Sequence, residues 1–359
     1  MLTSILGSSK KESCHPCSNP CKSVSVCGEN IKTIAKNLGF SFCGIAKAEP
    51  LAGQKAYNED FIGRNLHEPF KYLEKNLEKR LDPSGIMPDV KSVIAVLLNY
   101  YPDKIIPEED NFIISKYAYG RDYYVVVKKK LNELIDFITS PPHPSPEGEP
   151  ACRTGRGPGV RRSPEREMPG VRMVKALGFV DSGSVMEKVW AQRCGVGWQG
   201  KNTILINKHG GSFFFIGIIL TNLDVEPDKP EADHCGTCNK CREACPTGAL
   251  EKPYQLTISK CIAYHTIESK NPIPEEFRGK FHSRIFGCDI CQDVCPYNRF
   301  SIPSTDPSRT PHVDLLRMRK RDWLSLTEEQ FKILFKGMPV YRTGYIRLME
   351  NIRFVAKGD

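Results

Sequence analysis

Eight cysteines in the second half of the chain constrain its fold more than any other feature. Seven of them form two runs separated by Cys261, and the runs are Cys235-Gly-Thr-Cys238-Asn-Lys-Cys241-Arg-Glu-Ala-Cys245-Pro246 and Cys288-Asp-Ile-Cys291-Gln-Asp-Val-Cys295-Pro296. A C-x2-C-x2-C-x3-C-P run is a bacterial arrangement for 4Fe–4S clusters, each of which needs four thiolates. The eight cysteines therefore predict two 4Fe–4S clusters and a role in electron transfer.

The spacing also predicts how the cysteines divide between the clusters. In such a run the fourth cysteine binds the other cluster, and Pro246 keeps the local turn from continuing as a helix. We expect one cluster on Cys235, Cys238, Cys241 and Cys295, and the other on Cys245, Cys261, Cys288 and Cys291. A pair of structural zinc sites is the alternative, since zinc also uses sets of four cysteines at C-x2-C spacing. Disulfides are not expected, because no secretory signal is apparent and intracellular thiols stay reduced.

Length and charge set broader limits. A chain of 359 residues predicts two or more domains. No apolar run reaches the roughly 18 residues of a membrane span, so we expect a cytoplasmic protein without a membrane partner. The net charge of +9 is compatible with an anionic partner such as RNA, and equally with lysines that only solvate the surface.

Two stretches lack the composition of a packed core. Residues 1–28 carry Cys14, Cys17, Cys21 and Cys27 among Ser, Pro and Lys, and predict a disordered extension, with metal binding as the alternative. Residues 141–172 are crowded with Pro, Gly and Arg and predict a disordered insertion. The chain then divides into a catalytic domain at 29–225, a cysteine-rich domain at 226–302 and a helical C-terminal segment at 303–359.

The rest of the sequence alternates between segments with the apolar spacing of helices and segments with the apolar runs of strands. Spacing of apolar residues predicts helices over 31–39, 70–80, 123–138, 322–336 and 345–355, and apolar runs predict strands over 40–45, 91–98 and 212–220. Such alternation of helices and strands indicates an α/β domain before the cysteines.

A second motif lies upstream of the cysteines, at Val180-Asp181-Ser182-Gly183-Ser184 and Gly195-Val-Gly197-Trp198-Gln-Gly200-Lys201-Asn202-Thr203. Asp181 is predicted at the tip of a strand, where an acid or base can face a cavity. Ser182 or Ser184 is expected to cap the helix that follows, and the glycines allow a bulky ligand to approach the backbone. The alternative is purely structural, with Asp181 as a cap and the glycines as turns. The pattern is neither a dinucleotide fingerprint nor a Walker loop.

Taken in order, these blocks resemble the epoxyqueuosine reductase family, which is related to the cobalamin-dependent reductive dehalogenases. The resemblance covers about residues 30–140 and 173–359 and rests on V-D-S-G-S-V-M-E-K, G-V-G-W-Q-G-K-N-T, the two cysteine runs and C-I-A-Y-H-T-I-E. It implies a mixed fold, α+β or α/β, in which a nitroreductase-like cobalamin-binding domain precedes a ferredoxin-like domain with two 4Fe–4S clusters and a short helical tail. The implied reaction is reduction of the epoxide of epoxyqueuosine to queuosine, the last step of queuosine biosynthesis.

The resemblance also implies cofactors, partners and site residues. The cofactors are base-off cobalamin and the two clusters, and the substrate is the wobble base of tRNAs with a GUN anticodon, those for Asp, Asn, His and Tyr. Asp181 takes the position of the proton donor, with a pKa raised by burial against the corrin or the substrate. Cofactor contacts are expected from Gly200, Lys201, Asn202 and Thr203, then from Lys188 and Arg80, with Tyr264 lining the passage between cluster and cobalt.

Some partners stay open at this point. An external low-potential electron donor is required, and a monomer is expected. The basic run from Arg317 to Arg321 either contacts tRNA phosphates or forms a solvated helix face. A reductive dehalogenase-like enzyme for a small molecule and a non-catalytic electron carrier are the competing interpretations, and the segment of about 200 residues before the cysteines argues against the carrier.

Overall fold

The structure is a computed structural model that describes residues 27–68, 70–140 and 173–358. These residues belong to one compact unit. Residues 1–26 of the expected extension and all of the expected insertion at 141–172 lie outside the described residues. Among the helices described, none is both long and apolar enough to cross a membrane.

A four-stranded sheet forms the first half of the protein. It contains β1 (Phe42–Lys47), β2 (Ser92–Asn99), β7 (Phe214–Thr221) and β4 (Ala176–Phe179) in the order β1-β2-β7-β4. All three strand pairs are antiparallel. The two central strands are almost entirely buried, which fits their nearly continuous apolar sequences. The alternation of helices and strands therefore produces an antiparallel sheet, as in α+β folds, and not the parallel sheet of an α/β domain.

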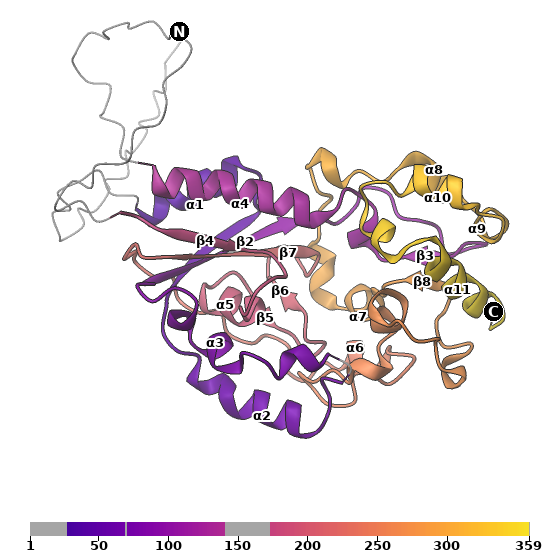
Figure 1. Cartoon of the computed structure of the whole chain (residues 1–359), viewed down its shortest axis with the longest axis horizontal. Coiled ribbons are helices and arrows are strands. Elements are labelled where there is room, and N and C mark those ends of the chain that lie inside the picture. The colour runs from indigo at the N-terminus through magenta and orange to yellow at the C-terminus, as the bar shows by residue number, and fades with distance from the viewer. Residues whose placement is uncertain (1–26, 69, 141–172, 359) are drawn as a thin grey trace, which may run out of the picture. The chain divides into compact units, whose positions relative to one another are not determined.

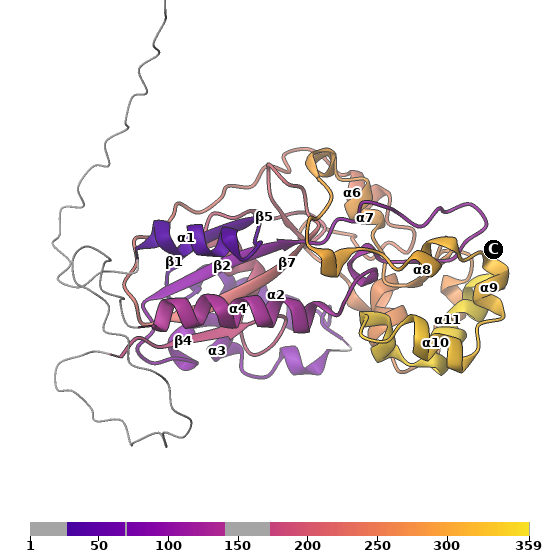
Figure 2. The same cartoon turned by 90° about the horizontal axis from the view of Figure 1, so that it is seen from above.

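Helices cover both faces of this sheet. α1 (Gly28–Asn37) and α4 (Tyr123–Thr139) pack on one face, and α5 (Glu187–Arg193) packs on the other (Figures 1 and 2). α4 begins where the Asp122 carboxylate accepts the amide of Tyr124 at 3.1 Å. It buries Val127, Leu131, Leu134 and Ile138, which recur at helical spacing along one face. α4 thus holds its first residues, Tyr123 and Tyr124, at a fixed end of the sheet.

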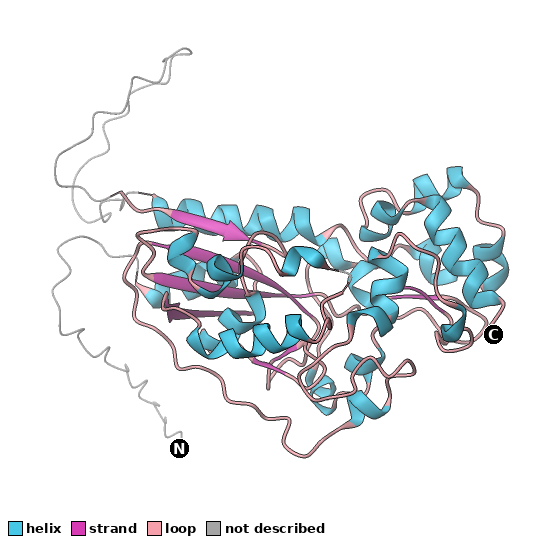
Figure 3. Cartoon of the chain, turned by 60° about the horizontal axis from the view of Figure 1, so that its bottom comes forward, coloured by secondary structure: helices cyan, strands magenta, loops and turns pink. Residues whose placement is uncertain are grey.

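A second hydrophobic core joins distant parts of the chain. The short strand β3 (Ile113–Ile114) pairs in parallel with β8 (Arg284–Phe286), which lies inside the cysteine region. Packed around this pair are α8 (Val313–Arg317), α9 (Lys320–Leu324), α10 (Glu328–Leu334) and α11 (Tyr345–Ala356). Figure 3 shows these C-terminal helices gathered beside a small strand pair, away from the main sheet.

Two buried asparagines tie the C-terminal helices to the rest of this core. Asn351 on α11 donates to the carbonyls of Thr266 at 2.9 Å and Ile285 at 3.0 Å. The indole N–H of Trp323 donates to Asn111 at 2.9 Å. The C-terminal segment is therefore part of a shared core, and the domain boundaries at 225 and 302 stay a prediction.

The remaining elements are short. They are α2 (Lys55–Gly63), α3 (Leu77–Leu81), the antiparallel pair β5 (Trp198–Gln199) and β6 (Leu205–Ile206), α6 (Lys240–Glu243) and α7 (Ile290–Asp293). A single π-helical turn spans Tyr264–Glu268. All of these elements except α2 and α3 lie within or next to the motifs identified from sequence.

Most predicted elements are confirmed with small shifts of their ends, and two predicted helices are wrong. The helix predicted over 70–80 is a 3-10 turn at Lys71–Leu73 followed by α3, because Asn76 adopts a left-handed backbone with φ of 57°. The helix predicted over 322–336 is two helices, α9 and α10. Thr327 interrupts it by forming a capping box with Gln330 at the start of α10.

Candidate active site

Four of the eight cysteines surround a small cavity. Its volume is about 60 Å³, and Cys235, Cys238, Cys241 and Cys295 line it. α6 carries Cys241, α7 ends just before Cys295, and the two short helices contact each other. The structure thus brings together the cysteines that the spacing assigns to one cluster, three from the first run and one from the second.

The other four cysteines also lie near one another. Burial raises the pKa of Cys288 to about 12, and the charge of Cys261 adds to the increase. Cys261 has Cys245 as a charged neighbour, and Cys291 has both Cys288 and Cys261. Burial raises the pKa of Cys261, Cys288 and Cys291 and so opposes their ionisation, whereas a bound metal group requires and stabilises the thiolates. Cys291 also interacts with Cys241 of the first set, so the two sets are neighbours.

The G-W-x-G-K-N-T motif contacts the cysteine loops. The Lys201 ammonium is buried and donates to the carbonyls of Gly236 at 2.6 Å and Cys238 at 2.9 Å. Asn202 donates to the carbonyl of Cys291 at 3.2 Å. A Cβ atom on Gly200 would lie 2.4 Å from Cδ1 of Ile206 and 2.9 Å from Oδ1 of Asn202, so a larger residue there would displace these side chains. The structure places Lys201 and Asn202 at the cysteine loops, whereas the resemblance led us to expect them at the cobalamin.

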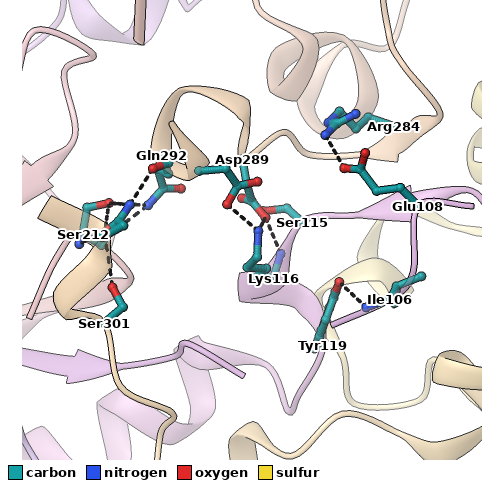
Figure 4. Close-up of polar contacts among 12 residues, drawn as sticks. Ile106, Glu108, Ser115, Lys116, Tyr119, Ser212, Arg284, Asp289, Gln292 and Ser301 are labelled. Atoms are coloured by element: carbon teal, nitrogen blue, oxygen red, sulfur yellow. Dashed lines mark hydrogen bonds and ion pairs between the residues drawn. The ribbon is translucent and has the colours of Figure 1, made fainter. Parts of the chain in front are cut away.

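A buried carboxylate next to Cys288 was missed by the sequence analysis. Asp289 accepts hydrogen bonds from the Ser115 hydroxyl and, at 2.8 Å, from the Lys116 amide (Figure 4). The Lys116 ammonium pairs with Asp293 at 2.6 Å. Burial lowers the pKa of Lys116, but Asp289 and Asp293 raise it by more, so the ammonium stays charged. This network anchors the second cysteine run to the segment after β3.

Gln292 makes a second anchor in the same run. Its buried amide nitrogen lies 3.1 Å from the Ser212 carbonyl (Figure 4). The same nitrogen lies 3.2 Å from the Tyr100 hydroxyl. Ser212 lies two residues before β7, so the cysteine run is fastened to the main sheet. Neither contact has a local sequence signal, because its partners lie 80 and 192 residues away.

A cavity of about 670 Å³ opens between the main sheet, the start of α4 and the second cysteine run. Its wall is strongly aromatic, with Tyr100, Tyr117, Tyr123, Tyr124, Phe214, Phe215 and Phe286. Asp181, Glu187, Lys188 and the cluster-run residue Cys288 line the same cavity. A hollow of about 520 Å³ shares Asp181, Glu187 and Lys188 with it, and a third of about 220 Å³ continues past Lys188. The three hollows together form an extended site of the kind that holds a large cofactor and a substrate.

Asp181 follows the end of β4, as predicted, and reaches this cavity. Its backbone is left-handed, with φ of 44°, which is uncommon for a residue other than glycine. Its Oδ2 accepts hydrogen bonds from the hydroxyls of Tyr123 at 2.7 Å and Tyr124 at 3.2 Å. The side chain is exposed to the cavity, so its expected burial depends on a bound group and stays a prediction.

The predicted serine cap of α5 is wrong. α5 begins at Glu187 with Met186 in the capping position, where no side chain caps the helix. The Ser182 hydroxyl instead accepts the amide of Val180 at 3.4 Å. The polar group at the start of α5 is Glu187 itself, whose carboxyl accepts the Asp181 amide.

Glu187 and Lys188 lie side by side in the wall of the cavity. Burial among protein atoms raises the pKa of Glu187 to about 8, and the charge of Asp181 contributes. The Lys188 side chain is exposed to the cavity although protein surrounds it, and this desolvation lowers its pKa against the opposing effect of Asp181 and Glu187. Its ammonium donates to the Thr203 carbonyl at 2.8 Å.

The other expected cofactor residues divide between two places. Arg80 lines the two smaller hollows and donates to the Leu73 carbonyl at 3.2 Å. Thr203 lines the hollow of about 220 Å³. Tyr264 packs edge-on against Phe70, with ring centroids 5.5 Å apart, and its amide donates to the Cys261 sulfur. Arg80, Lys188 and Thr203 are therefore at the extended site, and Tyr264 is at a cysteine.

We expect the titration of Glu187 to lower stability as the pH rises. The folded protein keeps the Glu187 proton up to about pH 8, whereas the unfolded chain releases it near 4.5, the ordinary pKa of a glutamate. Between these two pH values the folded state binds more protons than the unfolded chain. The stability that the protonated Glu187 contributes is fully present below the pKa of the unfolded chain, and it is lost as the pH rises through the pKa of the folded protein. Glu187→Gln should remove this dependence of stability on pH. The melting temperature of the variant should therefore rise relative to that of the wild type as the pH is raised from about 5 to about 8.5.

Thermal unfolding under anaerobic conditions across this range measures the effect. Glu133→Gln on the exposed side of α4 is a matched control, which should follow the wild type at every pH. A constant difference between Glu187→Gln and the wild type would show that Glu187 does not titrate in this window.

Comparison with known proteins matches both halves of the chain. Residues 234–298 match the family described as "4Fe-4S double cluster binding domain", and residues 80–152 match "Epoxyqueuosine reductase QueG, DUF1730". An epoxyqueuosine reductase from Cellulophaga algicola is 42% identical over 325 residues, which cover 90% of this chain and 96% of that protein. The match of residues 234–298 to the 4Fe-4S double cluster family decides in favour of iron–sulfur clusters over the alternative zinc sites.

Solved structures agree with the sequence matches. The crystal structure of an epoxyqueuosine reductase with an epoxyqueuosine-modified tRNA-Tyr stem loop has a TM-score of 0.75 and 28% identity, covering 90% of this chain and 79% of that one. A catabolic reductive dehalogenase has a TM-score of 0.42 at 16% identity, which is too distant to bear on function.

Proposed function

Since the chain belongs to the epoxyqueuosine reductase family, we propose that it reduces the epoxide of epoxyqueuosine in tRNA within the cavity lined by Asp181 and Cys288. One observation carries the assignment of the site. A cysteine of the predicted cluster set and a carboxyl group at a strand end line the same cavity. A source of electrons and a source of protons thereby meet at one place, which is what a reduction requires.

The reaction defines what the site must supply. Two electrons and two protons enter, both C–O bonds of the epoxide break, a C=C double bond forms and water leaves. When bound, base-off cobalamin would supply a cobalt nucleophile for an epoxide carbon, with two 4Fe–4S clusters delivering electrons one at a time. The chain itself has to hold these groups, exclude bulk water and protonate the departing oxygen.

The extended site has the size and lining for such a cofactor. Three adjoining hollows share Asp181, Glu187, Lys188 and Arg80 between them. Arg80, Lys188 and Thr203 contribute polar groups at the two smaller hollows, and we assign them to the cobalamin. Lys201 and Asn202 are proposed to act indirectly, because they donate to carbonyls of the cysteine loops. Gly200 belongs to the same motif and lies against Ile206 and the Asn202 side chain. Tyr264 acts on the Cys261 ligand.

Asp181 is the proposed proton donor. It lines the cavity together with the aromatic wall and with Glu187 at the start of α5. The hydroxyls of Tyr123 and Tyr124 fix its Oδ2. Among the described residues, no donor contacts Oδ1, so this oxygen is available to carry the proton toward the substrate. The aromatic wall excludes water when substrate and cofactor are bound, which strengthens electrostatic interactions within the site.

The cysteine sets suggest a direction for electron flow. Cys288, which we assign to the second set, lines the proposed reaction cavity. Cys295 of the first set lines a separate hollow of about 610 Å³, together with Arg299 and Lys116. We propose that an external low-potential donor reduces the cluster at Cys295, and that electrons pass through the Cys288 set to the cavity.

The RNA partner is proposed to be a tRNA with a GUN anticodon. Arg317 at the end of α8 and Arg321 within α9 are exposed, and they lie at a corner between two helices rather than along one helix face. Exposed arginines at such a corner can contact phosphates. A wobble base in a single-stranded loop can leave its stack at low cost and enter a pocket.

The function is tested with anaerobically purified protein carrying both clusters and cobalamin. With a chemical reductant and tRNA that contains epoxyqueuosine, we expect the modified nucleoside to lose one oxygen atom in mass analysis and to elute as queuosine. Protein without cobalamin serves as the control. If fully loaded protein leaves epoxyqueuosine unchanged, the proposed function is wrong.

A further inference from the structure

The turn that carries Asp181 is held in a conformation that it would not adopt readily by itself. Asp181 has φ of 44° and Gly183 has φ of 73°. A Cβ atom at Gly183 would lie 3.0 Å from the ring of Phe179, so the turn also folds tightly back on β4. A non-glycine residue in this region persists only where surrounding contacts hold it. The position of the Asp181 carboxylate therefore depends on groups outside the turn.

Two tyrosines hold the turn from the side of α4. The Tyr124 hydroxyl donates to the Asp181 carbonyl at 3.1 Å and to its Oδ2, and the Tyr123 hydroxyl donates to the same oxygen. The Tyr123 ring stacks on Phe215 at 4.7 Å, and Arg342 lies over the Tyr124 ring at 4.7 Å. Both rings are thus fixed by packing. They touch the carboxylate directly, so their removal would change its chemistry as well as its position.

Glu187 holds the turn from the opposite side and does so through the backbone. Its carboxyl oxygen accepts the amide of Asp181, and the amide of Ser182 also donates to this carboxyl group. These two amides lie on either side of the Asp181 Cα atom, one in the peptide before Asp181 and one in the peptide after it. As the first residue of α5, Glu187 is fixed by a helix that packs on the main sheet.

We propose that Glu187 is a positioning residue that holds the Asp181 turn at the cavity by accepting hydrogen bonds from the amides of Asp181 and Ser182. The proposal rests on the proposed role of Asp181 as proton donor, and it requires no charge on Glu187. An uncharged carboxyl group keeps a carbonyl oxygen that accepts an amide, and a glutamine side chain has the same acceptor and nearly the same shape. The required feature is therefore an acceptor at this place.

Hydrogen exchange tests the contact directly. The full-length protein with clusters and cobalamin is compared as wild type, Glu187→Ala, Glu187→Gln and the exposed control Glu133→Ala. Alanine should raise the exchange rate of the amides of Asp181 and Ser182 by about tenfold or more, because each loses its acceptor. Glutamine and the control should keep the protection of the wild type. Amides of β2 and β7 report whether each variant is folded.

Turnover on epoxyqueuosine tRNA supplies the second measurement. Because the turn acts in the chemical step, alanine should lower kcat while KM stays within about twofold, and glutamine should restore kcat. Unchanged exchange at Asp181 and Ser182 in the alanine variant would overturn the proposal. So would a glutamine variant that loses protection, or one that keeps protection and loses as much kcat as alanine. If the wild type shows no turnover, the proposed function fails and the exchange data still decide the contact.

Discussion

Replacement of Asp181 by asparagine should lower the turnover of epoxyqueuosine by roughly 10²–10⁴-fold, the usual contribution of a positioned general acid. Asparagine preserves the shape of the side chain and a carbonyl oxygen that can accept the hydroxyls of Tyr123 and Tyr124. It has no carboxyl proton to give to the departing oxygen. The expected loss therefore lies in kcat, with little change in KM.

The measurement compares single turnovers of variant and wild type on the same modified tRNA, after iron and cobalamin contents are shown to be equal. Asp136→Asn is the matched control, since Asp136 lies on the exposed side of α4. Its activity should equal that of the wild type. Full activity in Asp181→Asn would remove Asp181 from the mechanism, and loss of cobalamin from that variant would assign it to cofactor binding instead.

The location of Asp181 could be predicted from sequence, but its partners could not. An apolar stretch followed by Asp-Ser-Gly marks a strand end, which is a local pattern. The tyrosines that hold Asp181 lie 57 and 58 residues earlier on α4, and nothing in their own sequence indicates that contact. No role for Glu187 could be predicted from the sequence, because its role depends on the left-handed turn that precedes it.

The same limit explains the assignment of Lys201 and Asn202. Glycines around them indicated a close approach to a cofactor, and this local inference says nothing about which one. Their hydrogen bonds go to carbonyls 35 to 89 residues later in the chain, within the cysteine loops. The buried Asp289 likewise gains its partners Ser115 and Lys116 from a segment more than 170 residues away. Contacts at such separations follow from the tertiary fold and not from periodicity or spacing.

Removal of a single cluster cysteine should abolish turnover and also report which cluster that cysteine holds. Cys288→Ala should lose about half of the bound iron, because a 4Fe–4S cluster depends on four thiolates and alanine offers no ligand. Since Cys288 lines the reaction cavity, the remaining cluster should still accept electrons but have no short path to the site. Cys43→Ala, at a half-buried position on β1, is the matched control and should keep all of its iron.

The pairing of the eight cysteines gives this prediction its sharpest form. Cys235→Ala and Cys295→Ala remove ligands that line one cavity although they come from different runs. They should leave the same residual electron paramagnetic resonance spectrum after reduction. Cys261→Ala and Cys288→Ala should share a different one, because their sulfur atoms are neighbours. If Cys295→Ala instead matched Cys288→Ala, each run would hold its own cluster, and the interleaved ligation with its route from Cys295 to the cavity would be wrong.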